Sequence, residues 1–384
     1  MDVRVTCNGS SIECVCAGQL ALIIIPSLLV FSTLTIISRI IWSFLKNKSS
    51  ILSSSAVSSD QNGPKAGHSA LSSWEMPAQC ILEEVEFLKN GRYGATCMGQ
   101  LKRDGVVTAV IIKMFKGSSN SRDAKVFTEL ALFYSAVCKH DNLVRMLHCQ
   151  TRRSPMYLVF EKSTPGNLLH FLWSLRQGGH GTCHQEQPFS ERSVYLVAKQ
   201  VATGLDYLLS EHRIVHGNVT ARSMLIGPTL LVKVSGLAVA FQSRQTETET
   251  ETVGREGTTG APLKWQAPER LLRLPVTARS DVWSFGVFLY ELITLGAPPF
   301  PELEPSETFL QTLANYKLKR PPNCGGALFD LVKYCCMWNF KDRPAYSAII
   351  KLLESYIHLA DTKPLSVTEH IDIAEYRRKA GLAP

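Results

Sequence analysis

Residues 216–223 read His-Gly-Asn-Val-Thr-Ala-Arg-Ser, and this stretch decides the fold once the rest of the chain is read with it. A segment this short is weak evidence alone. Other short segments accompany it in a fixed order, and motifs gain specificity from such context. Along the chain these are Leu88–Cys97, Val110–Lys113, His140–Val144, Pro155–Glu161, Lys233–Ala238, Pro262–Arg270, Asp281–Gly286, Thr294–Pro301 and Asp342–Pro344.

The ordered set resembles the protein tyrosine kinases over residues 79–358. The stretch 216–223 is similar to their catalytic loop, H-R-D-L-A-A-R-N, and Leu88–Cys97 to their glycine-rich loop. The segment Val110–Lys113 is similar to V-A-I-K, and Pro262–Arg270 to the A-P-E segment. The resemblance implies an α+β, two-lobed protein-kinase fold with a β-rich N-lobe, a helical C-lobe and ATP as the cofactor.

Three positions that carry the chemistry in that family differ here. Asn218 stands where the family has the Asp that accepts the substrate proton, and an amide takes up no proton near pH 7. Ser223 and Gly236 stand where the family has its two side-chain ligands for Mg²⁺. Because Mg²⁺ prefers carboxylate and phosphate oxygens, we expect it to bind poorly, and we treat all three as degenerate catalytic positions.

The positions that face the nucleotide in the family are partly kept. Ile111 replaces a smaller Ala and shares a strand face with the phosphate-contacting lysine, so we expect a narrowed cleft. Ordinary core packing would give the same pattern, so both interpretations stay open. By resemblance the nucleotide-binding residues are Gly91, Gly94, Lys113, its partner Glu129, the gatekeeper Phe160 and Glu161.

The structural positions of the family are better preserved. By resemblance, Glu269 and Arg343 form a buried ion pair, and Asp281 holds the backbone of the catalytic loop. Gly217 replaces the Arg that binds a phosphorylated activation loop, and the corresponding segment, roughly 239–266, contains no Tyr. The usual phosphorylation switch is therefore expected to be absent.

Residues 18–38 contain no Asp, Glu, Lys or Arg and are long enough to cross a bilayer as a helix, which takes about 20 apolar residues. A buried core helix or a signal peptide would be shorter or differently flanked. Basic residues follow the span rather than precede it, which predicts an N-terminus outside and a cytosolic kinase-like domain. We therefore expect a short outer segment at 1–17, the span at 18–38, a juxtamembrane linker at 39–78, the kinase-like domain at 79–360 and a tail at 361–384.

Composition limits the possible partners. The net charge of +8 is modest and no dense Lys/Arg block occurs, so we expect no nucleic-acid partner. Cys7, Cys14 and Cys16 precede the span, and this odd number could link two chains into a homodimer, as could the span itself. The membrane and other signalling proteins or kinases are the partners we expect.

Three functions are compatible with these features. The first is a membrane-tethered pseudokinase that acts as a signalling scaffold or as the allosteric partner of an active kinase. The second is a slow protein tyrosine kinase, because phosphoryl transfer depends largely on positioning and charge stabilisation. The third, a ligand-binding receptor, is disfavoured because residues 1–17 are too few for a folded module. Tyr376 in the tail is either a phosphorylation site for another kinase or an unmodified tyrosine.

Overall fold

The computed structural model describes residues 70–91, 93–117, 121–177, 188–248, 262–306, 308–322, 324–367 and 371–380. All of them belong to the unit Lys65–Pro384. The expected outer segment 1–17, the expected span 18–38 and linker residues 39–69 lie outside the described residues. Across the described ranges, no helix is both long and apolar enough to cross a bilayer.

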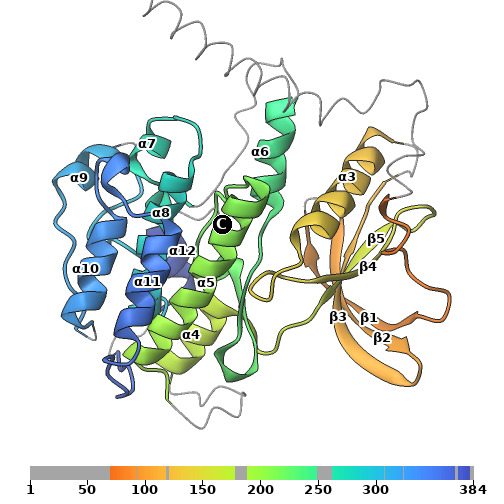
Figure 1. Cartoon of the computed structure of the whole chain (residues 1–384), viewed down its shortest axis with the longest axis horizontal. Helices are drawn as coiled ribbons and strands as arrows, with labels where there is room; N and C mark the ends of the chain where they lie inside the picture. The colour runs from red at the N-terminus through yellow and green to blue at the C-terminus, as the bar shows by residue number, and fades with distance from the viewer. Residues whose placement is uncertain are drawn as a thin grey trace, which may run out of the picture. The chain divides into compact units, whose positions relative to one another are not determined.

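An antiparallel five-stranded sheet forms the N-lobe, in the order β1-β2-β3-β5-β4 (Figure 1). Strand β3 is rich in β-branched residues, which suit a pleated, half-buried surface. Asp104 and Gly105, both with positive φ, turn β2 into β3. The strands are β1 Ile81–Asn90, β2 Ala95–Arg103, β3 Val106–Met114, β4 Met146–Gln150 and β5 Tyr157–Glu161.

The helix α3, Arg122–Val137, packs against this sheet. Ser121 caps its N-terminus by accepting a hydrogen bond from the Ala124 N–H. Phe127, Leu130 and Tyr134 are buried at helical spacing and join Phe160 of β5 in one hydrophobic cluster. This face of α3 therefore forms the hydrophobic core between the helix and the sheet.

The C-lobe is mainly helical (Figure 1). Its helix α8, Ala278–Ile293, is buried along most of its length. Thr277 and Ser280 form a capping box at its start. The other helices are α4 Leu168–Arg176, α5 Glu191–His212, α6 Ala238–Thr248, α7 Pro268–Leu271, α9 Phe309–Asn315, α10 Gly326–Cys335, α11 Tyr346–Tyr356 and α12 Ile373–Ala380, with 3₁₀ turns at Ala221–Ser223, Pro228–Leu230, Leu263–Trp265 and Phe340–Asp342.

A second, three-stranded sheet lies beside the catalytic loop, in the order β6-β7-β8. Its strands are β6 Gly166–Asn167, β7 Met224–Ile226 and β8 Val232–Val234. Strand β7 follows the loop 216–223 directly, and β8 leads into Gly236. The two-lobed architecture predicted from the sequence is confirmed, and this small sheet brings the two degenerate stretches together.

The packed region extends past both ends of the predicted kinase-like domain. Leu71 is fully buried, and the Glu75 carboxylate accepts hydrogen bonds from the N–H and hydroxyl of Thr151, so part of the expected linker belongs to the N-lobe. In the expected tail, the Leu365 N–H donates to the Phe189 carbonyl, and α12 follows.

Candidate functional site

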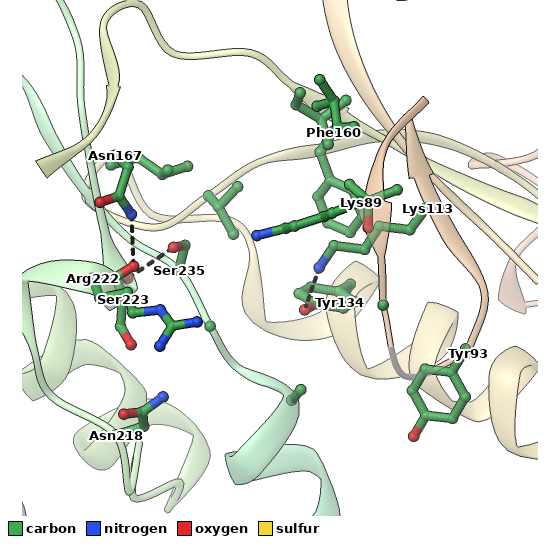
Figure 2. Close-up of a pocket in the computed structure, with 18 of the residues that line it drawn as sticks. Lys89, Tyr93, Lys113, Tyr134, Phe160, Asn167, Asn218, Arg222, Ser223 and Ser235 are labelled. Atoms are coloured by element: carbon green, nitrogen blue, oxygen red, sulfur yellow. Dashed lines mark hydrogen bonds between the residues drawn. The ribbon is translucent and has the colours of Figure 1, made fainter. Parts of the chain in front are cut away.

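A cavity of about 790 Å³ lies between the lobes, and it brings together residues from distant parts of the sequence (Figure 2). Lys89, Lys113 and Arg222 supply cationic groups to its walls. Glu129 does not line it. The predicted positions that do line it are Gly91, Gly94, Lys113, Phe160, Glu161, Asn218, Ser223 and Gly236.

Lys113 is held by aromatic side chains. Its Nζ donates to the Tyr134 hydroxyl at 3.4 Å and lies 4.8 Å from the centroid of the Phe160 ring (Figure 2). The two rings contact each other edge-to-face, with centroids 4.8 Å apart. The predicted pairing of Lys113 with Glu129 stays a prediction: among the described residues Lys113 contacts these two rings, and Glu129 does not line the cavity.

The glycine-rich loop is folded onto the end of β3. The Gly91 N–H donates to the Gly94 carbonyl at 2.7 Å, and the Lys116 N–H donates to the Tyr93 carbonyl at 2.7 Å. A Cβ added to Gly94 would lie 2.3 Å from the Met114 carbonyl oxygen, closer than real Cβ atoms approach. Gly94 therefore permits the close approach of two backbone segments, and the Tyr93 ring lies at the edge of Phe127.

On the C-lobe side, Asp281 holds the catalytic loop as predicted. Its carboxylate accepts the N–H groups of His216 at 2.7 Å and Gly217 at 2.9 Å. His216 Nδ1 accepts the Asn218 N–H at 3.1 Å, so Nε2 carries the ring proton and donates it to the Ser235 carbonyl at 2.7 Å. Burial lowers the pKa of His216 to about 4, which keeps this ring neutral.

The two degenerate metal-ligand positions face each other. A Cβ on Gly236 would lie 3.2 Å from the Ser223 Oγ, and Gly236 has a φ of 76° that favours glycine. The Ser223 hydroxyl accepts a hydrogen bond from the Thr220 hydroxyl at 3.3 Å. No carboxylate lies on either residue, so the Ser223 hydroxyl is the one side-chain oxygen that these two positions supply.

The carboxyl groups that do line the cavity are engaged elsewhere. Glu161 forms an ion pair with Lys233 at 2.7 Å, and Glu161 also accepts the Arg145 N–H. Glu291 is fully buried, and burial raises its pKa to about 8, so it is largely protonated at neutral pH. Within the described ranges, no cluster of His, Cys, Asp and Glu side chains is arranged to hold a metal ion.

The segment after Gly236 forms a helix where the sequence predicted an activation loop. In α6, Val239 packs against the catalytic loop: its Cγ1 would lie 3.1 Å from a Cβ on Gly217, which has a φ of 74°. Phe241 contacts Phe133 of α3 with ring centroids 5.5 Å apart. The helix α6 therefore connects the catalytic loop with α3 (Figure 1), and residues 249–261 lie outside the description.

The predicted ion pair of the C-lobe is confirmed. Both nitrogens of the Arg343 fork bind Glu269, at 2.6 Å and 2.9 Å, and Arg343 also donates to the Met337 carbonyl. The Arg343 side chain is fully buried, and its hydrogen bonds lower the pKa of Glu269 against the opposing effect of burial. This pair joins α7 to the segment before α11.

Three residues of the site were missed in the sequence. Tyr134 could have been found from the apolar spacing with Phe127 and Leu130 on one helix face. Glu291 lies in the cavity wall, and its Oε2 accepts the N–H of Ala221 at 2.8 Å and the indole N–H of Trp265 at 2.8 Å. Tyr376 also lines the cavity, although no local pattern in the tail predicts that position.

Comparison with known proteins gives consistent matches. The model of a family described as protein tyrosine and serine/threonine kinase matches residues 82–353. Tyrosine-protein kinase STYK1 of Mus musculus is 30% identical over 414 residues, which cover 99% of this chain and 95% of the mouse protein. The Homo sapiens protein of that name is 31% identical over 405 residues, covering 95% and 92%. Tyrosine-protein kinase Abl of Drosophila melanogaster is 34% identical over 281 residues, covering 73% of this chain and 16% of that protein.

Proposed function

Because the chain belongs to the protein tyrosine and serine/threonine kinase family, we propose that it is a membrane-anchored, tyrosine-kinase-like pseudokinase of intracellular signalling. It would act as a scaffold or as the allosteric partner of an active kinase. The observation that carries this proposal is the contact between Ser223 and Gly236, where two metal-ligand positions of the family meet without a carboxylate.

Chemistry at the neighbouring positions supports the same conclusion. Asn218 lines the cavity at the position of the general base, and its amide cannot accept the substrate proton. Among the described residues, Lys113 contacts two aromatic rings and forms no ion pair with a carboxylate. Mg²⁺ is expected to bind poorly here, because it needs oxygen ligands in near-octahedral order and its usual carboxylates are missing.

The cationic side chains of the cavity favour an alternative function. Lys89, Lys113 and Arg222 all line it, and their positive charges could hold the phosphates of ATP without a tightly bound metal ion. The protein would then be a weakly active tyrosine kinase that transfers the γ-phosphate of ATP to protein tyrosine. Loss of the general base alone slows such a reaction by about 10²–10⁴.

Phosphotransfer distinguishes the two functions. The full-length protein is incubated with MgATP and a tyrosine-containing copolymer, and phosphotyrosine is measured beside the Lys113→Ala variant. We expect both proteins to give the same background signal. Phosphotyrosine that forms with the wild type and disappears in Lys113→Ala would overturn the pseudokinase proposal in favour of the weak kinase.

Membrane anchoring is part of the proposal and rests on the sequence of residues 18–38. The uncharged run and the basic residues after it support a single span with the N-terminus outside. Self-association through the span, or through Cys7, Cys14 or Cys16, is proposed as well. Carbonate extraction of cell membranes tests the anchor: the full chain should stay in the pellet, and a chain carrying Ile24→Lys and Leu29→Lys should be released. Release of the unchanged chain would contradict the anchor.

A further inference from the structure

The helix α12 places one buried side chain next to the catalytic loop. Tyr376 is 3% exposed, while Glu375, Arg377 and Arg378 of the same helix are exposed. The Tyr376 N–H donates to the Asp372 carbonyl at 2.8 Å, which starts the first helical turn. Among the residues of α12 whose burial is described, Tyr376 alone is buried, so its ring anchors the helix to the domain.

Trp173 forms one wall of the site that receives Tyr376. The two rings meet edge-to-face, with centroids 4.9 Å apart. Trp173 is itself fixed, because its indole N–H donates to the Gly296 carbonyl at 2.9 Å. A Cβ added to Gly296 would lie 2.8 Å from the indole ring, so the ring and this backbone are in close contact. This wall is therefore held in place by contacts that do not involve Tyr376.

Glu291 forms a second wall and carries an unused polar atom. Its Oε1 is buried and has no hydrogen-bond partner among the described residues, whereas its Oε2 accepts two N–H groups. Because Oε2 is occupied, the proton of the neutral acid belongs on Oε1. The Tyr376 hydroxyl does not pair with Oε1, so the ring contact with Trp173 carries the attachment of this side chain.

Tyr376 lies in the same cavity as Asn218 and Arg222 of the catalytic loop. We propose that this end of the cavity is a binding site for a tyrosine side chain, which Tyr376 fills in cis, so that α12 closes the cleft beside the catalytic loop. This inference goes beyond the pseudokinase proposal, and it holds whether or not any phosphotransfer remains.

The helix α12 is attached weakly enough to leave its site on the domain reversibly. Outside the tyrosine site, Arg378 of this helix forms an ion pair with Glu304 at 3.1 Å, and the two side chains are 60% and 62% exposed. Exposed pairs of this type contribute little. Because the helix is tethered to the domain, its effective concentration at the site is on the order of millimolar, and a free peptide competes only above that level.

Hydrogen–deuterium exchange of the full-length protein tests the site. In Tyr376→Ala, we expect amides of α12 and of residues 216–223 to exchange on the order of tenfold faster. These amides exchange when the helix opens locally, and without the ring contact this opening costs less free energy. Arg377→Ala, on the exposed face of the same helix, is the matched control and should exchange like the wild type. Exchange in α5 and α8 should not change in either variant.

A peptide of residues 366–384 then tests whether the site binds a tyrosine side chain that is supplied in trans. Added in excess to the Tyr376→Ala protein, it should restore slow exchange at residues 216–223, and the same peptide carrying Tyr376→Ala should not. Three outcomes would overturn the proposal: exchange in Tyr376→Ala equal to that in Arg377→Ala, faster exchange that spreads equally through α5 and α8, or no protection by the tyrosine peptide. None of these readouts depends on ATP, so failure here is separate from failure of the proposed function.

Discussion

Asp281 and Gly236 lie on opposite sides of the same catalytic loop, and they show how differently its two sides are built. On the C-lobe side, the Asp281 carboxylate accepts two backbone N–H groups, and the Glu269–Arg343 pair is bidentate and buried. On the cavity side, Gly236 contributes no side-chain oxygen and meets a serine hydroxyl. The interactions that maintain the fold are complete, whereas those that would bind a metal ion are not.

The difference indicates that the residues that hold the fold and the residues that would bind a metal ion are subject to separate requirements. A buried charge needs its partner for the lobe to stay folded, so Glu269 and Arg343 depend on each other. A metal ligand at the cavity surface has no such structural partner, and its replacement leaves the packing intact. Variants on the two sides should therefore differ in how strongly they affect the free energy of unfolding.

The largest effect is expected at Arg343. Arg343→Ala leaves the Glu269 carboxylate buried without its partner and should lower the free energy of unfolding by about 3–5 kcal/mol. Lys199→Ala is the control: it breaks an exposed pair with Glu354 and should change stability by about 0–1 kcal/mol. Denaturant unfolding measures both, and equal small losses would contradict the structural role of the C-lobe pair.

Glu291 lines the cavity, and its titration should make the free energy of unfolding depend on pH. Its pKa in the folded protein is about 8, above the ordinary value of 4.5, so the folded state holds this proton more tightly than the unfolded state. Stability from this group is fully present below pH 4.5 and is lost as the pH rises toward 8, by at most about 1.4 kcal/mol per pH unit.

Glu291→Gln removes this titration while keeping a neutral side chain of similar shape. Thermal unfolding from pH 5 to pH 8 should show a shallower loss of stability in Glu291→Gln than in the wild type. Parallel pH profiles for the two proteins would mean that Glu291 is ionised in the folded state across this range.

On the cavity side, Gly236→Ala should have a moderate effect. Its φ of 76° is unfavourable for residues with a Cβ, which costs about 1–2 kcal/mol, and the new atom would contact Ser223. Gly326→Ala at the start of α10 is the control, because no atom lies within 4 Å of its added Cβ and the change should stabilise by up to about 1 kcal/mol. Thermal unfolding that shows no difference between the two variants would contradict the backbone argument.

The smallest effect is expected at Tyr134. Tyr134→Phe removes the 3.4 Å hydrogen bond from Lys113 but keeps the ring contact with Phe160, so stability should fall by only about 0.5–1 kcal/mol. Leu130→Ala, on the same helix face, deletes buried apolar volume and should cost about 2–5 kcal/mol. A Tyr134→Phe loss as large as that of Leu130→Ala would show that the hydroxyl does more than hold Lys113.

The sequence predicted the two-lobed fold and most of the cavity because short-range patterns encode them. Glycines mark backbone close approaches, and the residues after His216 and Lys233 keep recognisable spacing. The contact between Lys113 and Tyr134 could not be predicted, because the rotation of a helix about its axis depends on tertiary packing. The position of Tyr376 could not be predicted, since contacts between a tail and a distant cleft leave no local signature.

Binding of ATP with and without Mg²⁺ tests the central claim most directly. Thermal unfolding of the full-length protein is followed in millimolar ATP, with Lys113→Ala as the control. A ligand at 100 times its dissociation constant adds about 2.7 kcal/mol, which shifts the unfolding midpoint by several degrees. The incomplete metal site predicts that adding Mg²⁺ produces no shift beyond that of ATP alone. A Mg²⁺-dependent shift of several degrees that is lost in Lys113→Ala would contradict it.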